Sequence, residues 1–257
     1  DEIIRYLKRF PPHSIQITLN GVTARTYESI TQVEGSFMPA MRIIRRLAKH
    51  KFPLLLKAVC LKQNQHEIGR IKEFSEELLG KPKNHKYSFL YDGIILPRLN
   101  GDKTPLNYRL SFEELSEVRR QDRDIWEEYQ ESITACSLPA RNRKNALFQC
   151  NSWENEFTID PYGYLRFCGF SRKYKLDVKT IPFRKGFYRL IDMIRRLTFR
   201  TRSPCKECRL REYCYYCPVR AFLETGNEEG PVEYYCNLAL KTRAMEKTLM
   251  ATRKEKR

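Results

Sequence analysis

Two closely spaced cysteine pairs constrain this sequence more than any other feature. They follow the pattern Cys205-x2-Cys208-x5-Cys214-x2-Cys217 in a chain of 257 residues that contains nine cysteines. A CxxC pair lets two thiolates bind one metal centre, because a tight turn brings both sulfurs to one side. Disulfide-rich secreted proteins are usually small, whereas this chain can bury a real core and shows no signal peptide. We therefore expect metal or cluster ligation in the reducing cytoplasm.

Three more cysteines extend the pattern on both sides of the pairs. Cys150-x12-Gly163-x4-Cys168 precedes them, and Cys236 follows Cys217 after 18 residues. Seven cysteines with organised spacing exceed the four thiolates of one tetrahedral zinc site. This favours iron–sulfur clusters, while a zinc-binding interaction module and an electron-transfer module stay open as alternatives.

The complete pattern resembles the SPASM domain, the C-terminal auxiliary-cluster domain of many radical S-adenosylmethionine (SAM) enzymes. The family signature is C-x(9–15)-G-x4-C followed by C-x2-C-x5-C-x3-C-x17-C, and only Cys217 departs from it, by lying one residue early. The resemblance covers about Cys136 to Met245 and implies two auxiliary 4Fe-4S clusters. It assigns one cluster to Cys205, Cys208, Cys214 and Cys236, and the other to Cys150, Cys168 and Cys217, with Cys136 as the candidate eighth ligand.

The first half of the chain alternates strands and helices, which predicts an α/β fold with a parallel sheet. Apolar runs predict strands at residues 15–19, 53–60 and 87–91, the second with Cys60 as a small core residue. Between them, Ser36 and Asn64 are expected to cap two helices, and Gly80 to end the second. The apolar positions of these helices are Met38, Met41, Ile44 and Leu47, then Ile68, Ile71, Phe74 and Leu78.

This half resembles the later βα units of the TIM-like radical SAM barrel. Residues 15–21, IQITLNG, are similar to the family strand I-x-I-S-L-D-G, whose serine lies near bound SAM. The resemblance implies SAM-binding roles for Thr18, at the serine position, and Asn20, at the aspartate position. A purely structural role is the alternative, since a threonine in a strand and an asparagine before a glycine turn need no ligand.

The second half has a different character. Ser111 and Glu114 form a capping box that begins a boundary helix reaching about Ser132. Further on we expect a β-hairpin at residues 157–167 around Gly163, a helix at 187–197 and a last helix from about Tyr234. The predicted organisation is a partial radical SAM barrel at residues 1–135 and a SPASM domain at 136–257, with a hairpin and short helices.

The resemblance also implies an activity. The family's C-x3-C-x2-C motif, which binds the SAM-cleaving 4Fe-4S cluster, does not occur in this sequence. We expect it upstream in a longer protein that holds SAM and this third cluster, and we expect the present chain to be inactive alone. The implied function is maturation of a peptide or protein, such as thioether or other crosslinking of a ribosomal precursor. Formylglycine-forming members carry an aspartate where this sequence has Gly169, so that reaction is disfavoured.

The net charge of +17 indicates which partners the protein can attract, and it does not indicate the fold. It favours an acidic peptide or protein substrate, such as an acidic leader peptide. Nucleic acid ranks well below these, because the basic residues are dispersed in pairs such as Arg45–Arg46 and Arg195–Arg196. The resemblance adds an electron donor such as flavodoxin or ferredoxin. No apolar run approaches the ~18–20 residues of a membrane span, so no membrane partner is expected.

Overall fold

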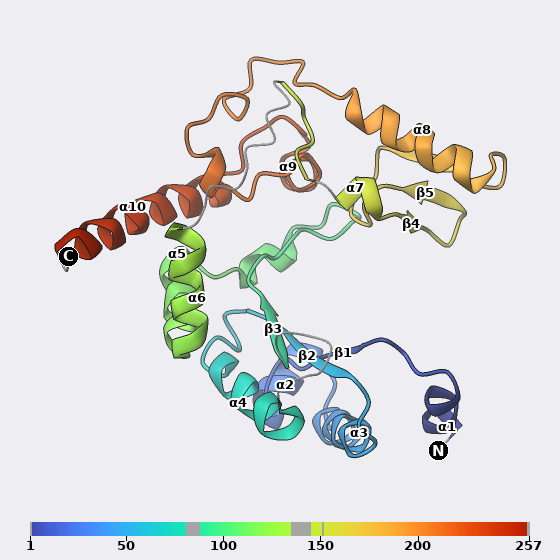
Figure 1. Ribbon diagram of the computed structural model, residues 1–257, viewed down its shortest axis with the longest axis vertical. Coiled ribbons are helices and arrows are strands. Elements are labelled where there is room, and N and C mark those ends of the chain that lie inside the picture. The colour runs from blue at the N-terminus through green and yellow to red at the C-terminus, as the bar shows by residue number, and fades with distance from the viewer. Residues whose placement is uncertain (1, 81–87, 135–144, 151, 256–257) are drawn as a thin grey trace. The chain divides into compact units, whose positions relative to one another are not determined.

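The computed structural model describes residues 2–80, 88–134, 145–150 and 152–255 (Figure 1). The chain forms two compact units. The first comprises Asp1–Ile95 and Leu106–Tyr129, and the second comprises Leu96–Pro105 and Gln130–Arg257. The boundary that the sequence predicts, between residues 135 and 136, lies outside the described residues, as does Cys136.

A three-stranded parallel sheet forms the centre of the first unit. Its strands are β1 (Ile15–Thr18), β2 (Leu54–Val59) and β3 (Phe89–Asp92), in the order β1-β2-β3. Thr18 pairs with Lys57 and Val59 pairs with Asp92, so the carboxyl ends of the strands lie at one edge. The predicted α/β class and parallel pairing are confirmed.

The two faces of this sheet differ in burial. Leu54, Leu56 and Ala58 of β2 are buried on the face that carries the apolar positions of the strands. The helices between residues 1 and 95 of this unit are α1 (Glu2–Arg9), α2 (Ala24–Thr31), α3 (Phe37–Lys49) and α4 (Ile68–Leu79), and α4 contacts β2 and β3. On the opposite face Leu55 of β2 is also buried, whereas Thr18 of β1 and Leu90 of β3 are exposed. The sheet therefore presents a partly polar, accessible face at the end of β1.

The two expected helix caps are wrong in detail. The Ser36 side chain donates to the Val33 carbonyl at 2.6 Å and makes no capping bond to α3. Asn64 lies before α4 but does not cap it. Its side-chain Nδ2 instead donates hydrogen bonds to the backbone carbonyls of Asn20, after β1, and Val59, at the end of β2. Met38, expected on the apolar face of α3, is 63% exposed. Gly80 ends α4 with a φ of 62°, as expected.

Two helices replace the single boundary helix predicted from the sequence. The capping box of Ser111 and Glu114 is confirmed and begins α5 (Phe112–Arg120). Asp122 then accepts a hydrogen bond from the Ile125 amide at the start of α6 (Arg123–Thr134) and pairs with Lys72 Nζ at 2.7 Å. This pairing holds the chain at Asp122 and separates the two helices. A short 3-10 helix, η1, spans Thr104–Tyr108.

The second unit contains a small antiparallel sheet and short helices. The predicted hairpin is confirmed as β4 (Thr158–Ile159) and β5 (Tyr164–Arg166), with Gly163 at a φ of 83°, and β6 (Lys175–Asp177) adds a strand that was not predicted. The helices are α7 (Ser152–Asn155), α8 (Phe183–Arg195), η2 (Arg211–Tyr213), α9 (Pro218–Thr225) and α10 (Glu233–Glu255). Across the ranges that the structure describes, no helix combines the length and hydrophobicity needed to cross a bilayer.

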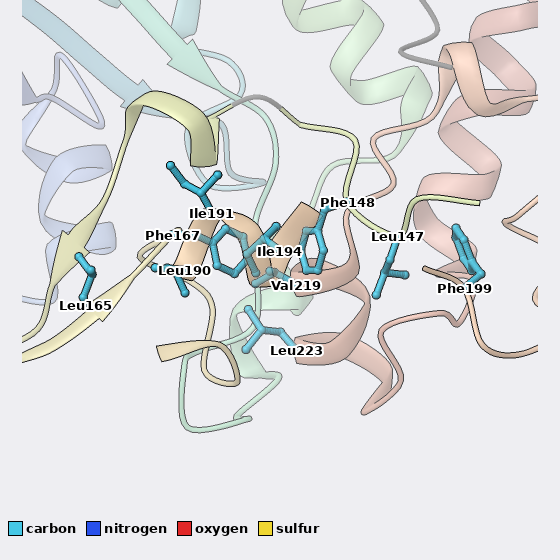
Figure 2. Packing of buried hydrophobic residues seen from close by; sticks show 10 residues of the cluster. All are labelled: Leu147, Phe148, Leu165, Phe167, Leu190, Ile191, Ile194, Phe199, Val219 and Leu223. Atoms are coloured by element: carbon cyan, nitrogen blue, oxygen red, sulfur yellow. The ribbon is translucent and has the colours of Figure 1, made fainter. Parts of the chain in front are cut away.

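Aromatic and aliphatic side chains from the hairpin, α8 and α9 form the core of this unit (Figure 2). Its members are Leu147, Phe148, Leu165, Phe167, Leu190, Ile191, Ile194, Phe199, Val219 and Leu223. The rings of Phe148 and Phe167 meet edge to face at 5.0 Å. Cys168, Cys205 and Cys217 pack against this core and are partly buried. The core therefore brings cysteines from two distant parts of the sequence, the hairpin and the CxxC pairs, to its border.

Candidate metal centre

The turn that carries Cys168 is held by a buried ion pair of the hairpin. Arg166 Nη2 and Nε donate to Asp160 Oδ2 at 2.8 and 3.0 Å, and Arg166 Nη1 donates to the Ser171 carbonyl at 2.9 Å. The Ser171 amide closes the turn by donating to the Cys168 carbonyl at 3.0 Å. A planar guanidinium fork suits this bidentate role. The hairpin thus fixes the backbone of Cys168 on both sides.

Asp160 also organises the hairpin turn itself. Its Oδ1 accepts hydrogen bonds from the Tyr162 and Tyr164 amides at 3.0 Å each. Burial acts to raise the pKa of the carboxyl, but the Tyr164, Arg166 and Tyr162 hydrogen bonds outweigh it and lower the pKa. The carboxylate therefore stays ionised and paired with Arg166 at neutral pH.

The loop of the first CxxC pair is fixed by Glu229. Its carboxylate accepts the amides of Arg200 and Thr201, each at 2.8 Å, and its backbone carbonyl accepts the Ser203 hydroxyl. Ser203 Oγ in turn accepts the Cys205 amide at 3.1 Å. This chain of hydrogen bonds places Cys205 at the border of the core.

Four thiols from this loop and from α10 interact with one another. Burial raises the pKa of Cys205, and the thiols of Cys236 and Cys208 act in the same direction. Burial raises the pKa of Cys214 to about 11, again with contributions from Cys236, Cys205 and Cys208. Burial and the Cys208 thiol raise the pKa of Cys236 as well. Each of these four thiols is therefore coupled electrostatically to at least one other member of the group.

A second pair of thiols interacts separately. Burial raises the pKa of Cys217, and the Cys168 thiol adds to the rise. Cys150 is solvent-exposed, and Cys136 lies outside the described residues. Cys60 belongs to the first unit, where it is fully buried with a pKa of about 12, so its interpretation as a small core residue is confirmed.

The chemistry of these thiols fits an iron–sulfur cluster. Several neighbouring thiolates in a partly buried site repel one another, and cationic iron removes that repulsion and deprotonates its ligands. Within the parts of the chain that the structure describes, no three Cys, His, Asp or Glu side chains converge on a single metal ion. A 4Fe-4S cluster binds its thiolates through different iron atoms, so it does not need ligands that meet at one point.

The two residues expected near SAM lie at the carboxyl edge of the parallel sheet. Thr18 is exposed at the end of β1. Asn20 already has structural partners, because its Oδ1 accepts the Val59 amide at 3.0 Å and its carbonyl accepts Asn64 Nδ2 at 3.0 Å. Asn64 Nδ2 also donates to the Val59 carbonyl at 2.9 Å. The side chain of Asn20 therefore joins β1 to β2, whereas Thr18 is an exposed residue.

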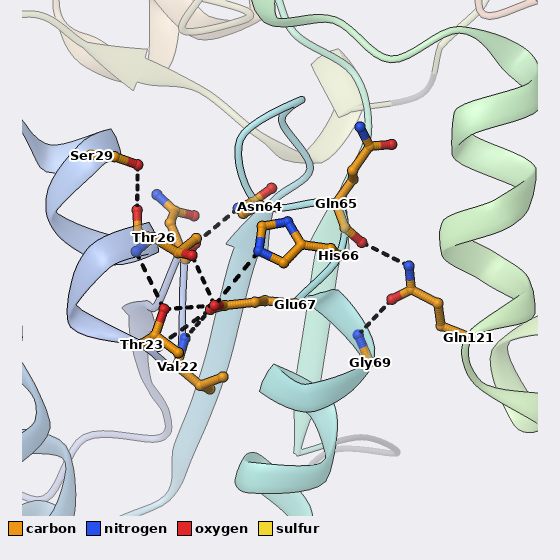
Figure 3. Close-up of polar contacts among 11 residues, drawn as sticks. Val22, Thr23, Thr26, Ser29, Asn64, Gln65, His66, Glu67, Gly69 and Gln121 are labelled. Carbon is orange, nitrogen blue, oxygen red and sulfur yellow. Dashed lines mark hydrogen bonds and ion pairs between the residues drawn. The ribbon is translucent and has the colours of Figure 1, made fainter.

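Glu67 is a key residue of this edge that the sequence pattern did not reveal (Figure 3). It is 2% exposed and accepts four hydrogen bonds: the Val22 amide at 2.7 Å, the Thr23 amide at 3.3 Å, Thr23 Oγ1 at 2.6 Å and Thr26 Oγ1 at 2.8 Å. Exposed His66 lies 3.8 Å away. Burial acts to raise the pKa of Glu67, but the hydrogen bonds outweigh it and lower the pKa. The sequence signal that could have identified Glu67 is its position as an acidic residue directly before the helix that begins at Ile68.

Comparison with known proteins adds a likeness of fold. No protein-family model matches the chain, and no curated protein matches it. A solved structure of native anSMEcpe with bound AdoMet and Kp18Cys peptide is similar, with a TM-score of 0.61 and 14% sequence identity. The match covers 91% of this chain and 66% of that one, so the chain spans about two thirds of that structure's length. At this identity the likeness shows the fold: a mixed α/β arrangement with a parallel sheet, similar to that of a protein crystallised with AdoMet and a peptide.

Proposed function

We propose that this protein is a radical SAM enzyme that modifies a peptide or protein, and that its second unit holds two auxiliary iron–sulfur clusters. The observation that carries the proposal is the division of the thiols. Cys205, Cys208, Cys214 and Cys236 interact with one another, and Cys217 interacts with Cys168. The SPASM resemblance assigns the same two groups to different clusters.

In this proposal each group of thiols has its own cluster. Cys205, Cys208, Cys214 and Cys236 bind one, while Cys168 and Cys217 bind the other together with Cys150 and, as a candidate, Cys136. Such clusters supply sites for one-electron transfer when bound. The protein's own contribution is to hold Cys168 through the Arg166 ion pair and Cys205 through Ser203 and Glu229.

The first unit supports the SAM part of the proposal. Ligands of α/β sheets bind at the carboxyl ends of the strands, and Thr18 is exposed at that edge. The similar structure contains both AdoMet and a peptide. The net charge of +17 favours an acidic substrate segment, such as a leader peptide, and an acidic electron donor.

Metal analysis of anaerobically purified and reconstituted protein tests the cluster assignment. We expect a brown protein with about eight iron atoms per chain. Cys214→Ser and Cys217→Ser should each lose about half of this iron, whereas Cys60→Ala, the control, should keep all of it. A colourless protein that binds zinc and takes up no iron would refute the proposal in favour of a zinc-binding module.

Assay of SAM cleavage tests the enzyme assignment. The full-length gene product, loaded with iron and supplied with a reductant, is expected to release 5′-deoxyadenosine from SAM. Thr18→Val should weaken SAM binding without changing the iron content. If the cluster-loaded protein releases no 5′-deoxyadenosine, it is an electron-transfer module instead.

A further inference from the structure

Arg211 lies between Cys208 and Cys214 in the sequence, and its guanidinium contacts the backbone at Cys205. It begins η2, and its Nη1 donates to the carbonyls of Cys205 at 3.4 Å and Lys206 at 3.1 Å. Its guanidinium carbon lies 5.5 Å from the centre of the Phe199 ring and 5.9 Å from that of Tyr216. Two carbonyls and two aromatic rings therefore hold the guanidinium against the CxxC loop.

The second terminal nitrogen of this guanidinium, Nη2, lacks a hydrogen-bond acceptor among the described residues. It is also buried. An arginine cannot release its proton to avoid the cost of burial. A buried charged donor without an acceptor is strongly unfavourable, so native proteins provide one or bind an ion there.

The chemistry around Nη2 indicates which acceptor is missing. The carbonyls that Arg211 Nη1 contacts belong to Cys205 and Lys206, so the guanidinium lies beside the first CxxC pair. Within the described residues no carboxylate forms an ion pair with Arg211. The other buried side-chain atoms without partners, Ser14 Oγ and Gln63 Oε1, are neutral and belong to the first unit. Arg211 thus combines a fixed charge, a donor without an acceptor and a position beside the backbone of Cys205.

We propose that Arg211 Nη2 donates a hydrogen bond to a sulfur of the cluster bound by Cys205, Cys208, Cys214 and Cys236, and that this raises the reduction potential of that cluster. The assignment rests on the proposed function, because it requires the cluster. Reduction adds one electron and therefore one negative charge, which a nearby cation and a donor to sulfur stabilise. Arg211 would then make this cluster easier to reduce than the same four thiolates alone.

Redox titration followed by electron paramagnetic resonance tests the assignment, with an external reductant and mediators supplying the electron. Arg211→Gln removes the charge and should lower the midpoint potential of one cluster by about 59 mV, a tenfold lower ratio of reduced to oxidised cluster at a fixed potential. Arg209→Gln is the matched control, because Arg209 is an exposed arginine of the same loop. It should change the ratio by less than twofold. The cluster of Cys168 and Cys217 should keep its potential in both variants.

A second measurement does not depend on any variant folding. Arginine labelled with ¹⁵N in its guanidinium group is incorporated into the unsubstituted protein, and pulsed resonance of the reduced cluster should show coupling to that nitrogen. Arg211→Lys, which keeps the charge but loses the fork, should remove the coupling. An iron-loaded protein without this coupling, or an Arg211→Gln variant with full iron and an unchanged potential, would overturn the assignment and leave the proposed function intact. Absence of iron from the unsubstituted protein would overturn both.

Discussion

Removal of the Glu67 carboxylate should weaken the edge of the sheet where SAM binding is proposed. Glu67→Ala leaves the Val22 and Thr23 amides without an acceptor, and the hydroxyls of Thr23 and Thr26 lose theirs as well. The hydroxyls can rotate toward other acceptors, but the amides cannot. At roughly 1–3 kcal/mol for each unsatisfied buried donor, the two amides predict a loss of about 2–4 kcal/mol once some water enters.

Glu67→Gln should be much milder, by about 1 kcal/mol, because only the charge assistance is lost. The glutamine carbonyl can accept both amides, while its NH2 group donates to the two hydroxyls, which also act as acceptors. Glu73→Ala on the exposed side of α4 is the control and should stay within about 0.5 kcal/mol of the unsubstituted protein.

Hydrogen exchange is the suitable assay, because the chain has two units and global unfolding need not be two-state. The Val22 and Thr23 amides should exchange at least tenfold faster in Glu67→Ala than in Glu67→Gln. The pH dependence has a defined sign: the lowered pKa of Glu67 means its stabilisation is complete above the unfolded value of about 4.3 and is lost as the pH falls through the folded value. Equal exchange in the two variants would refute the role given to the carboxylate.

Of three further predictions, two concern the hairpin of the second unit and the third concerns the buried Cys60 of the first unit. Gly163→Ala should destabilise the hairpin by about 1 kcal/mol, measured by hydrogen exchange of the hairpin amides, because φ is 83° and the new Cβ would lie 3.2 Å from the Lys179 side chain; unchanged exchange would contradict this. Arg166→Lys cannot make the bidentate pair and should accelerate hydrogen exchange around Cys168 while leaving the exchange of β2 unchanged. Cys60, with a pKa of about 12 and no exposed surface, should resist iodoacetamide at pH 8 in the folded protein, and rapid alkylation would show that the first unit opens readily.

Local patterns predicted the elements of this fold well. The apolar run at 53–60 became a buried central strand, and Gly163 forms the turn of the expected hairpin, because strand burial and turn chemistry are short-range effects. The turn expected at Asn20 and Gly21 is wrong, because the structure has no turn at these two residues. The cap at Asn64 failed since a distant strand end, Asn20, competes for the same side chain. The break at Asp122 was missed for a similar reason, because it depends on Lys72 across 50 residues of sequence.

The candidate site shows the same limit. Cysteine spacing singled out the thiols as candidate ligands, and their division between two clusters stays a prediction of the SPASM resemblance. Spacing could not identify Arg211 or Arg166, whose roles follow from carbonyls and carboxylates that only the fold brings near. Whether Cys150 and Cys136 complete the second group stays a prediction.

In each unit, a buried glutamate accepts the backbone amides of a turn near the proposed site. A turn that must present a functional group has amides that no secondary structure satisfies, and a buried glutamate from elsewhere accepts them. Glu67 does this for Val22 and Thr23, beyond the end of β1, and Glu229 does it for Arg200 and Thr201, just before Cys205. In both cases a threonine hydroxyl of the turn also donates to the carboxylate. Because an ionised acceptor binds such amides more strongly than a neutral one, each turn stays in place without help from a ligand. The proposed SAM edge and the proposed cluster loop are therefore built before their cofactors bind, which limits the ordering entropy that binding must overcome.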